Sequence, residues 1–382
     1  MTLSRRKMIL LVGGGAVLAA GGAFGFAATR GPRTAFLPWE QAGRYDDPRQ
    51  RALSWALLAP NPHNRQPWLA DLSEAGIITL YADPTRMLPE TDPFNRQITI
   101  GLGCFLELLR MAAAEDGHRA EMVLFPQGSD PAGLDLRPVA RITLTRDPSV
   151  ARDPLFAQAL ARRSNKEPFD LSRPVAPDLL PQLAAAVRGP ARFGGTVDPD
   201  EVQFWRTLTH EALRIEVETP RTFQESVDLF RIGHREVDAN PDGIDFTGPL
   251  FETLRLTGQF SRASAADPGS FAFQSGLDAV FANTDTAMGH VWLVTADNRR
   301  ETQIATGADW LRVNLAATAL GLGFQPLSQS LQEFPEMADP YRQVHERLAP
   351  AGGTVQMLAR VGYGPTVGAS PRWPLESRIL NA

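Results

Sequence analysis

The sequence predicts a mixed fold of helices and strands in two similar halves, on three observations. Helix-like and strand-like patterns alternate along the chain instead of forming separate blocks. Each half carries one long apolar helix, predicted over residues 98–116 and 302–320. With 382 residues, 43% of them hydrophobic, the chain can build one large or two medium cores. No residue-level repeat is evident, so the similarity is one of layout.

The first half is predicted to cover residues 46–150, after a leader over 1–30 and a linker over 31–45. A helix-like run at 52–58 leads into a turn that is rich in proline and asparagine. Beyond that turn the predicted order is a strand, the long helix and two strands, over residues 77–81, 98–116, 122–125 and 139–145.

The second half is predicted to cover residues 151–382. Its helices are expected at 156–164, 202–216, 222–235 and 302–320, and its strands at 292–295 and 356–361. Gly321 and Gly323 follow the long helix and predict its end. Residues 261–273 show little periodicity and predict a loop or lid between helices.

The N-terminus predicts an export signal. Arg5 and Arg6 precede an uncharged, weakly hydrophobic stretch over residues 8–29, a pattern that resembles a twin-arginine leader. Such a leader implies recognition by the twin-arginine export machinery and a periplasmic or exported protein. The stretch is also long enough to span a bilayer and lacks a clean A-x-A site, so an uncleaved membrane anchor stays open.

Composition excludes several classes of function. The formal net charge is −5, with basic residues scattered beyond the N-terminus, which argues against nucleic acid as a partner. The single cysteine, Cys104, lies in an apolar helical run and excludes an intrachain disulfide or a Cys-rich metal site. We expect a buried small side chain there. His210 and Glu211 are adjacent on a predicted helix, and we expect an exposed pair, not a metal site.

Residues 60–68, Pro-Asn-Pro-His-Asn-Arg-Gln-Pro-Trp, form the most informative segment. Its prolines and asparagines end the preceding helix and expose backbone amides. Asn64 and Gln66 can both donate and accept hydrogen bonds, which suits the edge of a heteroaromatic ring. The segment therefore predicts a helix cap that faces a ligand. The alternative is a capped turn with Trp68 packed in the core.

Three further segments are candidates for ligand binding. Arg162, Arg163, Ser164 and Lys166 concentrate positive charge and a hydroxyl, which suits a phosphate; the alternative is a solvated helix end. Ser328 and Gln329 follow a glycine-rich helix end, where free amides can donate to an electron-rich ring, unless the loop satisfies itself. Arg372 lies between two prolines and is either a second phosphate ligand or a surface arginine.

Together these four segments resemble the nitroreductase family of FMN proteins, over roughly residues 46–380. The motif order, the length, the segment 242–244 and the leader look most like the Acg-type branch. The resemblance implies an α+β nitroreductase-like fold in which two similar halves form an internal pseudo-dimer. It also implies FMN as the cofactor.

The resemblance implies a role for each candidate residue. Arg162, Arg163, Ser164 and Lys166 would hold the FMN phosphate and ribityl chain, with Arg372 joining them. The residues expected to approach the flavin from the other half are Pro60, Asn61 and Asn64. The backbone of Ser328 and Gln329 would face the ring, although the family often has an acidic residue and glycine there. Ser370 stands where classical members carry a basic residue, which leaves fewer cations for the phosphate.

Two functions follow from the resemblance. The first is an exported FMN oxidoreductase that passes electrons to a small electron-poor acceptor, with the flavin carrying the chemistry and no catalytic side chain. The second is an FMN-binding protein that stores or sequesters the flavin under a lid, without NAD(P)H reductase activity. The insertion at about residues 240–273 is the segment expected to form that lid.

Overall fold

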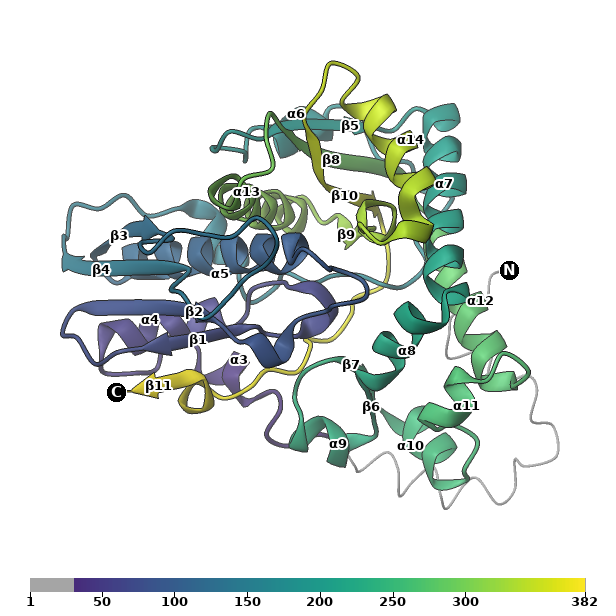
Figure 1. The fold of residues 1–382 in the computed structure, drawn as a ribbon, viewed down its shortest axis with the longest axis horizontal. Coiled ribbons are helices and arrows are strands. Elements are labelled where there is room, and N and C mark those ends of the chain that lie inside the picture. The colour runs from purple at the N-terminus through teal and green to yellow at the C-terminus, as the bar shows by residue number, and fades with distance from the viewer. Residues whose placement is uncertain (1–30, 382) are drawn as a thin grey trace.

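The computed structural model describes residues 31–381, which form two sheets flanking a central pair of helices (Figure 1). The predicted leader over residues 1–30 lies outside the described residues, so export stays a prediction. The predicted domain boundaries also stay predictions. The mixed architecture is α+β, because neighbouring strands in both large sheets are mainly antiparallel.

The sheet of the first half has the order β11-β1-β2-β4-β3. Strand β11 comes from the end of the chain and pairs in parallel with β1, whereas the other pairs are antiparallel. The five strands are β1 (Trp68–Asp71), β2 (Ile77–Ala82), β3 (His118–Leu124), β4 (Ala140–Arg146) and β11 (Ile379–Asn381). The C-terminal segment therefore crosses from the second half and completes the sheet of the first (Figure 1).

The sheet of the second half has the order β5-β8-β10-β9, with all pairs antiparallel. Its strands are β5 (Arg192–Thr196), β8 (Gly289–Thr295), β9 (Gly323–Pro326) and β10 (Thr354–Gly362). A long helix joins β2 to β3 in one half and β8 to β9 in the other. The order β1-β2-β4-β3 of the first sheet thus matches β5-β8-β10-β9 of the second.

These two joining helices, α5 (Arg96–Glu115) and α13 (Arg300–Ala319), pack against each other at the centre of the molecule. Each has 20 residues, begins with an arginine and carries a glycine at its eighth position, Gly103 or Gly307. A Cβ on Gly103 would overlap the carbonyl oxygen of Ile304, and one on Gly307 would overlap that of Ile100. Only glycine allows the two backbones to approach this closely.

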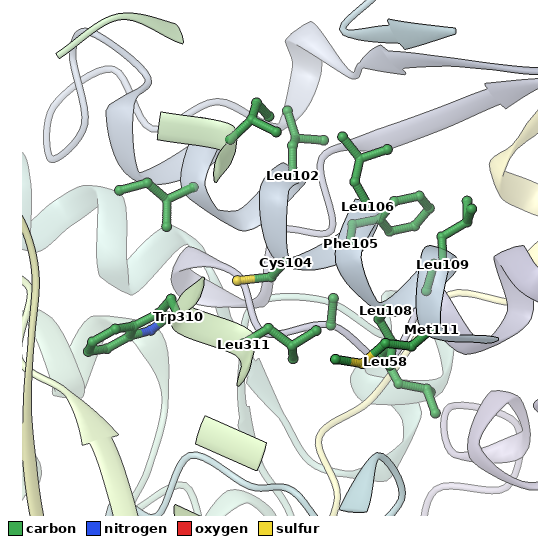
Figure 2. Packing of buried hydrophobic residues seen from close by; sticks show 14 of the residues in the cluster. Leu58, Leu102, Cys104, Phe105, Leu106, Leu108, Leu109, Met111, Trp310 and Leu311 are labelled. Carbon is green, nitrogen blue, oxygen red and sulfur yellow. The ribbon is translucent and has the colours of Figure 1, made fainter. Parts of the chain in front are cut away.

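The main core surrounds this crossing (Figure 2). Leu102, Phe105 and Leu109 of α5 are buried in one cluster with Trp310 and Leu311 of α13. Cys104 is buried as expected, and its Sγ lies 3.1 Å from the carbonyl oxygen of Gly307. Within residues 31–381, only α5 is long and apolar enough to cross a membrane, and 94% of that stretch is buried inside the protein, as in a core helix.

The other helices cover the outer faces and form an insertion between β5 and β8 (Figure 1). Those outside the insertion are α3 (Leu37–Gln41), α4 (Pro48–Ala56), α6 (Leu179–Ala184), α7 (Pro199–Glu218) and α14 (Ala338–Leu348). The insertion after α7 contains α8 (Pro220–Asp228), β6 (Phe230–Ile232), α9 (His234–Ala239), β7 (Ile244–Phe246), α10 (Pro249–Leu256), α11 (Arg262–Ala266) and α12 (Phe271–Asp285). Strands β6 and β7 pair in parallel.

Short 3-10 helices link these elements. They are η1 (Pro62–Asn64), η2 (Pro84–Arg86), η3 (Pro154–Gln158), η4 (Gln329–Leu331), η5 (Pro335–Met337) and η6 (Leu375–Arg378).

Three predicted elements were wrong. The expected helix at 156–164 is only the 3-10 helix η3 followed by turns, and Arg162, which the prediction placed near the end of the helix, is buried. The expected helix at 222–235 is broken after Asp228, where β6 pairs with β7 and Gly233 adopts a φ of +84°. The expected loop at 261–273 contains α11 and the start of α12. Ser261 and Ser270 cap these helices, and serine is also common in loops, so the composition did not distinguish the two.

We expect the glycine crossing to be sensitive to a single methyl group. Gly103→Ala and Gly307→Ala should each lower the unfolding free energy by about 1–3 kcal/mol, because the methyl must push two helices apart. Gly276→Ala is the matched control, because it lies within α12 and has no atom within 4 Å of the added Cβ. The control should leave stability unchanged or raise it by about 0.4–1 kcal/mol. Denaturant titration would contradict this account if all three variants behaved alike.

Candidate functional site

The segment 60–68 is a strained turn at the end of α4. His63, Asn64 and Gln66 have positive φ angles of 47°, 51° and 51°, a region that non-glycine residues seldom adopt. Asn61 holds the turn, because its Oδ1 accepts from the backbone N–H of Gln66 at 2.7 Å. Trp68 is 1% exposed and packs on Phe105. The segment is therefore a cap whose tryptophan is anchored in the core.

The end of α4 leaves backbone carbonyls that Arg372 binds. Its Nε donates to the carbonyl of Leu57 at 2.7 Å, and its Nη2 donates to those of Leu58 and Ala59 at 3.3 and 3.2 Å. Its Nη1 donates to Asn64 Oδ1 at 2.6 Å. A guanidinium suits this position, because the last carbonyls of a helix lack partners and carry partial negative charge. Arg372 is thus buried, not a surface arginine.

Arg162 and Arg163 join Arg372 from the second half. Arg162 is 3% exposed and donates to the same Leu58 carbonyl at 3.1 Å, and to Asn314 Oδ1 of α13 at 3.2 Å. The guanidinium carbon atoms of Arg163 and Arg372 lie 4.7 and 5.4 Å from the ring centre of Trp39 in α3. Here the arginine cluster means Arg162, Arg163 and Arg372. Its members come from two segments far apart in sequence, which meet at the end of α4.

The arginine cluster carries positive charge that is offset only weakly, because Asp245 raises the pKa of Arg372 less than burial and the neighbouring arginines lower it. Among residues 31–381, none of its three members forms an ion pair with a carboxylate. Burial lowers the pKa of Arg162 to about 10 and that of Arg372 to about 9, and the neighbouring arginines lower the pKa of Arg372 further. Nε of Arg163 is buried without a hydrogen-bond partner within the described part of the chain. Such a group of donors suits an anion.

Ser164 and Lys166 follow the cluster in sequence. Ser164 is half-buried and Lys166 is exposed. Lys166 lies close enough to His63, Asp245 and Glu216 to affect their pKa values. The pKa of Asp245, on β7, is raised by burial and lowered in part by Lys166 and Arg372. Lys166 therefore lies among groups from the cap, the insertion and α7.

Ser328 and Gln329 lie at the start of η4, half-buried. No hydrogen bond from the backbone N–H of either residue is found among residues 31–381. The Gln329 side chain interacts with the carboxyl of Glu216, which also accepts from Gln332 Nε2 at 2.8 Å. This end of the site thus combines available amide donors with a buried acid.

The structure brings most predicted residues together around the end of α4. Asn64, Arg162, Arg163 and Arg372 form one connected group, and the half-buried Pro60 and Asn61 belong to the same turn. Ser328 and Gln329 belong to a separate group with Glu216, and Lys166 lies near enough to Glu216 to lower its pKa.

Sequence reasoning missed four residues here: Trp39, Glu216, Asp245 and Asn314. Glu216 carried a usable signal, because it follows the buried Leu208 and Ala212 at steps of four along the apolar face of α7. Asn314 is likewise a polar residue within an apolar helix. Trp39 and Asp245 carried no such periodic signal.

His210 and Glu211 do not act as a pair, because His210 contacts Asp285 of α12 whereas Glu211 pairs with Arg214 of its own helix. The Nδ1 of His210 lies 2.9 Å from Asp285 Oδ1, and its ring stacks on Phe281 of α12 at 3.9 Å. Within the described range, no group of three or more His, Cys, Asp or Glu residues could hold a metal ion.

The insertion packs directly on the cap. The N–H of Gly243 donates to the carbonyl of Asn64 at 3.2 Å, and Gln66 Nε2 donates to the carbonyl of Pro241 at 2.7 Å. Between them Asp242, 4% exposed, pairs with Arg86 at 2.6 Å and Arg231 at 2.8 Å. The segment 241–243 is thereby held against the turn at the end of α4.

Sequence comparison finds relatives over most of the chain, although no family model matches it. It is 29% identical over 341 residues to the Mycobacterium tuberculosis protein named "Putative NAD(P)H nitroreductase acg", covering 85% of this chain and 93% of that protein. It is 26% identical over 336 residues to "Putative NAD(P)H nitroreductase Rv3131" of the same organism, covering 86% and 88%. The chain is therefore related to the nitroreductase family.

Two solved structures match more than half of the chain at low similarity. A protein from Anabaena variabilis described as "a putative nitroreductase" matches over 88% of this chain and 93% of its own, with 12% identity and a TM-score of 0.42. The FMN-dependent nitroreductase NfnB of Mycobacterium smegmatis, solved with NADPH, covers 57% and 92%, with 18% identity and a TM-score of 0.32. Both TM-scores are below 0.5.

The cap should make stability depend on pH. Burial lowers the pKa of His63 from 6.5 to about 4, with Lys166 and Arg65 lowering it further. The unfolded chain then binds more protons than the folded one between these values, so stability falls as pH drops from 6.5 to 4. His63→Gln should flatten the slope of unfolding free energy by up to about 1.4 kcal/mol per pH unit. Superimposable pH profiles for the two proteins would refute a neutral His63 in the folded protein.

Proposed function

We propose that this chain, related by sequence to proteins named nitroreductases, is an FMN-dependent oxidoreductase that reduces a small electron-poor acceptor. The observation that carries the proposal is the arginine cluster, whose charge has no carboxylate partner among residues 31–381. Buried unpaired cations are unfavourable, and a phosphate group would neutralise them. A nucleotide phosphate therefore fits the residues present.

The proposal assigns each predicted residue a role. Arg163 would donate its unpartnered Nε–H to the phosphate, while Arg162 and Arg372 supply charge from positions fixed by the Leu58 carbonyl. Ser164 and Lys166 extend the site toward the sugar chain. From the first half, Pro60, Asn61 and Asn64 would line the other side.

The ring end of the site would be formed by residues 328–332. FMN, when bound, supplies the electron transfer itself. The N–H groups of Ser328 and Gln329 are free to donate to acceptor atoms of the ring, because they bind no other group in the described structure. These residues would orient the ring. No side chain needs to act as a nucleophile.

We further propose that the two halves form an internal pseudo-dimer. The shared strand order, the matching positions of α5 and α13 and their paired glycines support this. In such an arrangement one chain supplies both sides of the site. The cap at Asn64 comes from the first half, and Arg162 and Arg163 come from the second.

A second function, flavin storage or sequestration, is favoured by the insertion. Residues 241–243 are bonded to Asn64 and Gln66, and Asp242 is locked by arginines from both halves, including Arg86 and Arg231. An insertion fixed over the cap would keep a nicotinamide away from a bound flavin. The two functions share one binding site and differ in access to it.

The phosphate assignment predicts selective weakening of FMN. Arg162→Met and Arg372→Met should each weaken FMN binding about 10- to 100-fold, because each removes a positive charge beside the phosphate, and a charged contact contributes about 1.5–3 kcal/mol. Affinity for riboflavin, which lacks the phosphate, should change far less. Arg173→Met is the matched control, because its guanidinium lies 3.5 Å from the Tyr363 ring centre, outside the cluster. Equal losses for both flavins, measured by fluorescence quenching, would overturn the assignment.

Access to the flavin separates the two functions. We expect anaerobic NADPH to bleach the bound flavin, as a reductase requires, and dithionite to complete the reduction. Bleaching by dithionite alone would contradict the reductase and support sequestration. In that case Asp242→Asn should speed reduction by NADPH, because it loosens residues 241–243, while the exposed Asp228→Asn should not.

A further inference from the structure

A buried acid lies beneath the ring end of the proposed site. Glu216, near the end of α7, is 6% exposed. Its Oε2 accepts from Gln332 Nε2 at 2.8 Å, and the Gln329 side chain lies close enough to lower the pKa of its carboxyl. Both glutamines belong to the segment whose amides we assign to the flavin ring. The position of that segment therefore depends on Glu216.

The surroundings of Glu216 contain polar atoms that are not yet satisfied. Ser330 Oγ and Gln332 Oε1 are buried and have no hydrogen-bond partner among residues 31–381. Buried polar atoms without partners are rare in proteins and often mark a functional site. Here two of them lie in the same short segment as Ser328 and Gln329.

The charged groups around Glu216 come from three elements. Glu225 of α8 opposes its ionisation, and Lys166 favours it. Glu333 lies next to Gln332 and is paired with Arg96 of α5 at 3.1 Å. Burial is the largest effect and raises the pKa of Glu216 to about 7, against the lowering effects of Gln332 and Gln329. The carboxyl thus changes charge close to neutral pH.

We propose that Glu216 is a positioning residue for the ring end of the site, which fixes residues 328–332 through Gln332 and whose charge sets how readily a bound flavin accepts electrons. The inference rests on the proposed function. Reduction adds negative charge to a flavin, so a nearby carboxylate opposes it and a neutral carboxyl does not. Glu216 exchanges only its own proton with solvent and forms no covalent bond.

The first test is the midpoint potential of the FMN-loaded protein between pH 5.5 and 8.5. Between pH 6 and 8 the potential should fall further in the wild type than in Glu216→Gln. The extra fall in midpoint potential should approach about 30 mV, which corresponds to a tenfold change in the equilibrium constant of the two-electron reduction. Glu211→Gln is the matched control on the same helix, where an exposed carboxylate pairs with Arg214. It should follow the wild type.

The second test uses the flavin-free protein. An acid whose pKa is raised from 4.5 to about 7 on folding stabilises the protein below pH 4.5, and that contribution is lost as pH rises through 7. The unfolding free energy of the wild type, relative to Glu216→Gln, should therefore decline between pH 5 and 8. Gln332→Met removes a hydrogen bond that favours the charged form, so it should move this decline to higher pH. Because Gln332→Met keeps Glu216, it can be compared with the wild type to test the proposal if Glu216→Gln does not fold.

The outcomes separate the two proposals. If FMN binds but the potentials of wild type and Glu216→Gln run in parallel, the role of Glu216 is wrong and the flavin site stands. If the protein takes up no FMN, the proposed function is wrong and the inference falls with it. If the potentials diverge as described and Glu211→Gln follows the wild type, Glu216 controls the flavin.

Discussion

The close crossing of α5 and α13 at Gly103 and Gly307 is the contact on which the rest of the structure depends. Because neither glycine has a side chain, the helix backbones touch, and the two sheets they serve are held at a fixed separation. That separation brings the end of α4, in the first half, to Arg162 and Arg163 in the second. The C-terminal segment then passes Arg372 through the same region before β11 joins the first sheet.

The candidate site is an electrostatic consequence of this arrangement. Helix α4 ends at carbonyls that attract guanidinium groups, and two arginines converge on the carbonyl of Leu58. Their hydrogen bonds are satisfied by neutral oxygens, so their positions are fixed, while their charge is offset only in part, by Asp245 near Arg372. The unfolded chain does not bear this cost, because its arginines are hydrated. A bound phosphate would offset it, which explains how a cluster that weakens the fold can serve binding.

Much of the fold was accessible from sequence because apolar periodicity is strong where elements are central. Both long helices, β2, β8 and β10 were predicted close to their actual bounds. Short edge strands such as β11 depend on pairing with residues distant in sequence, and they left no local pattern.

At the site, residue type identified the arginines, since clustered cations are unusual. The burial of Arg372 could not be foreseen, because its contacts with Leu57 and Leu58 span more than 300 residues of sequence. Glu216 was missed although its spacing from Leu208 and Ala212 placed it on the apolar face of α7, and its partner Gln332 is 116 residues away.

The central claim is that the arginine cluster binds the phosphate of a flavin, and a crystal structure of the protein with FMN tests it most directly. The account predicts a phosphate in contact with Arg162, Arg163 and Arg372, with the ring beside the N–H groups of Ser328 and Gln329. A flavin bound elsewhere, or an arginine cluster that holds no anion in the presence of saturating FMN, would contradict it.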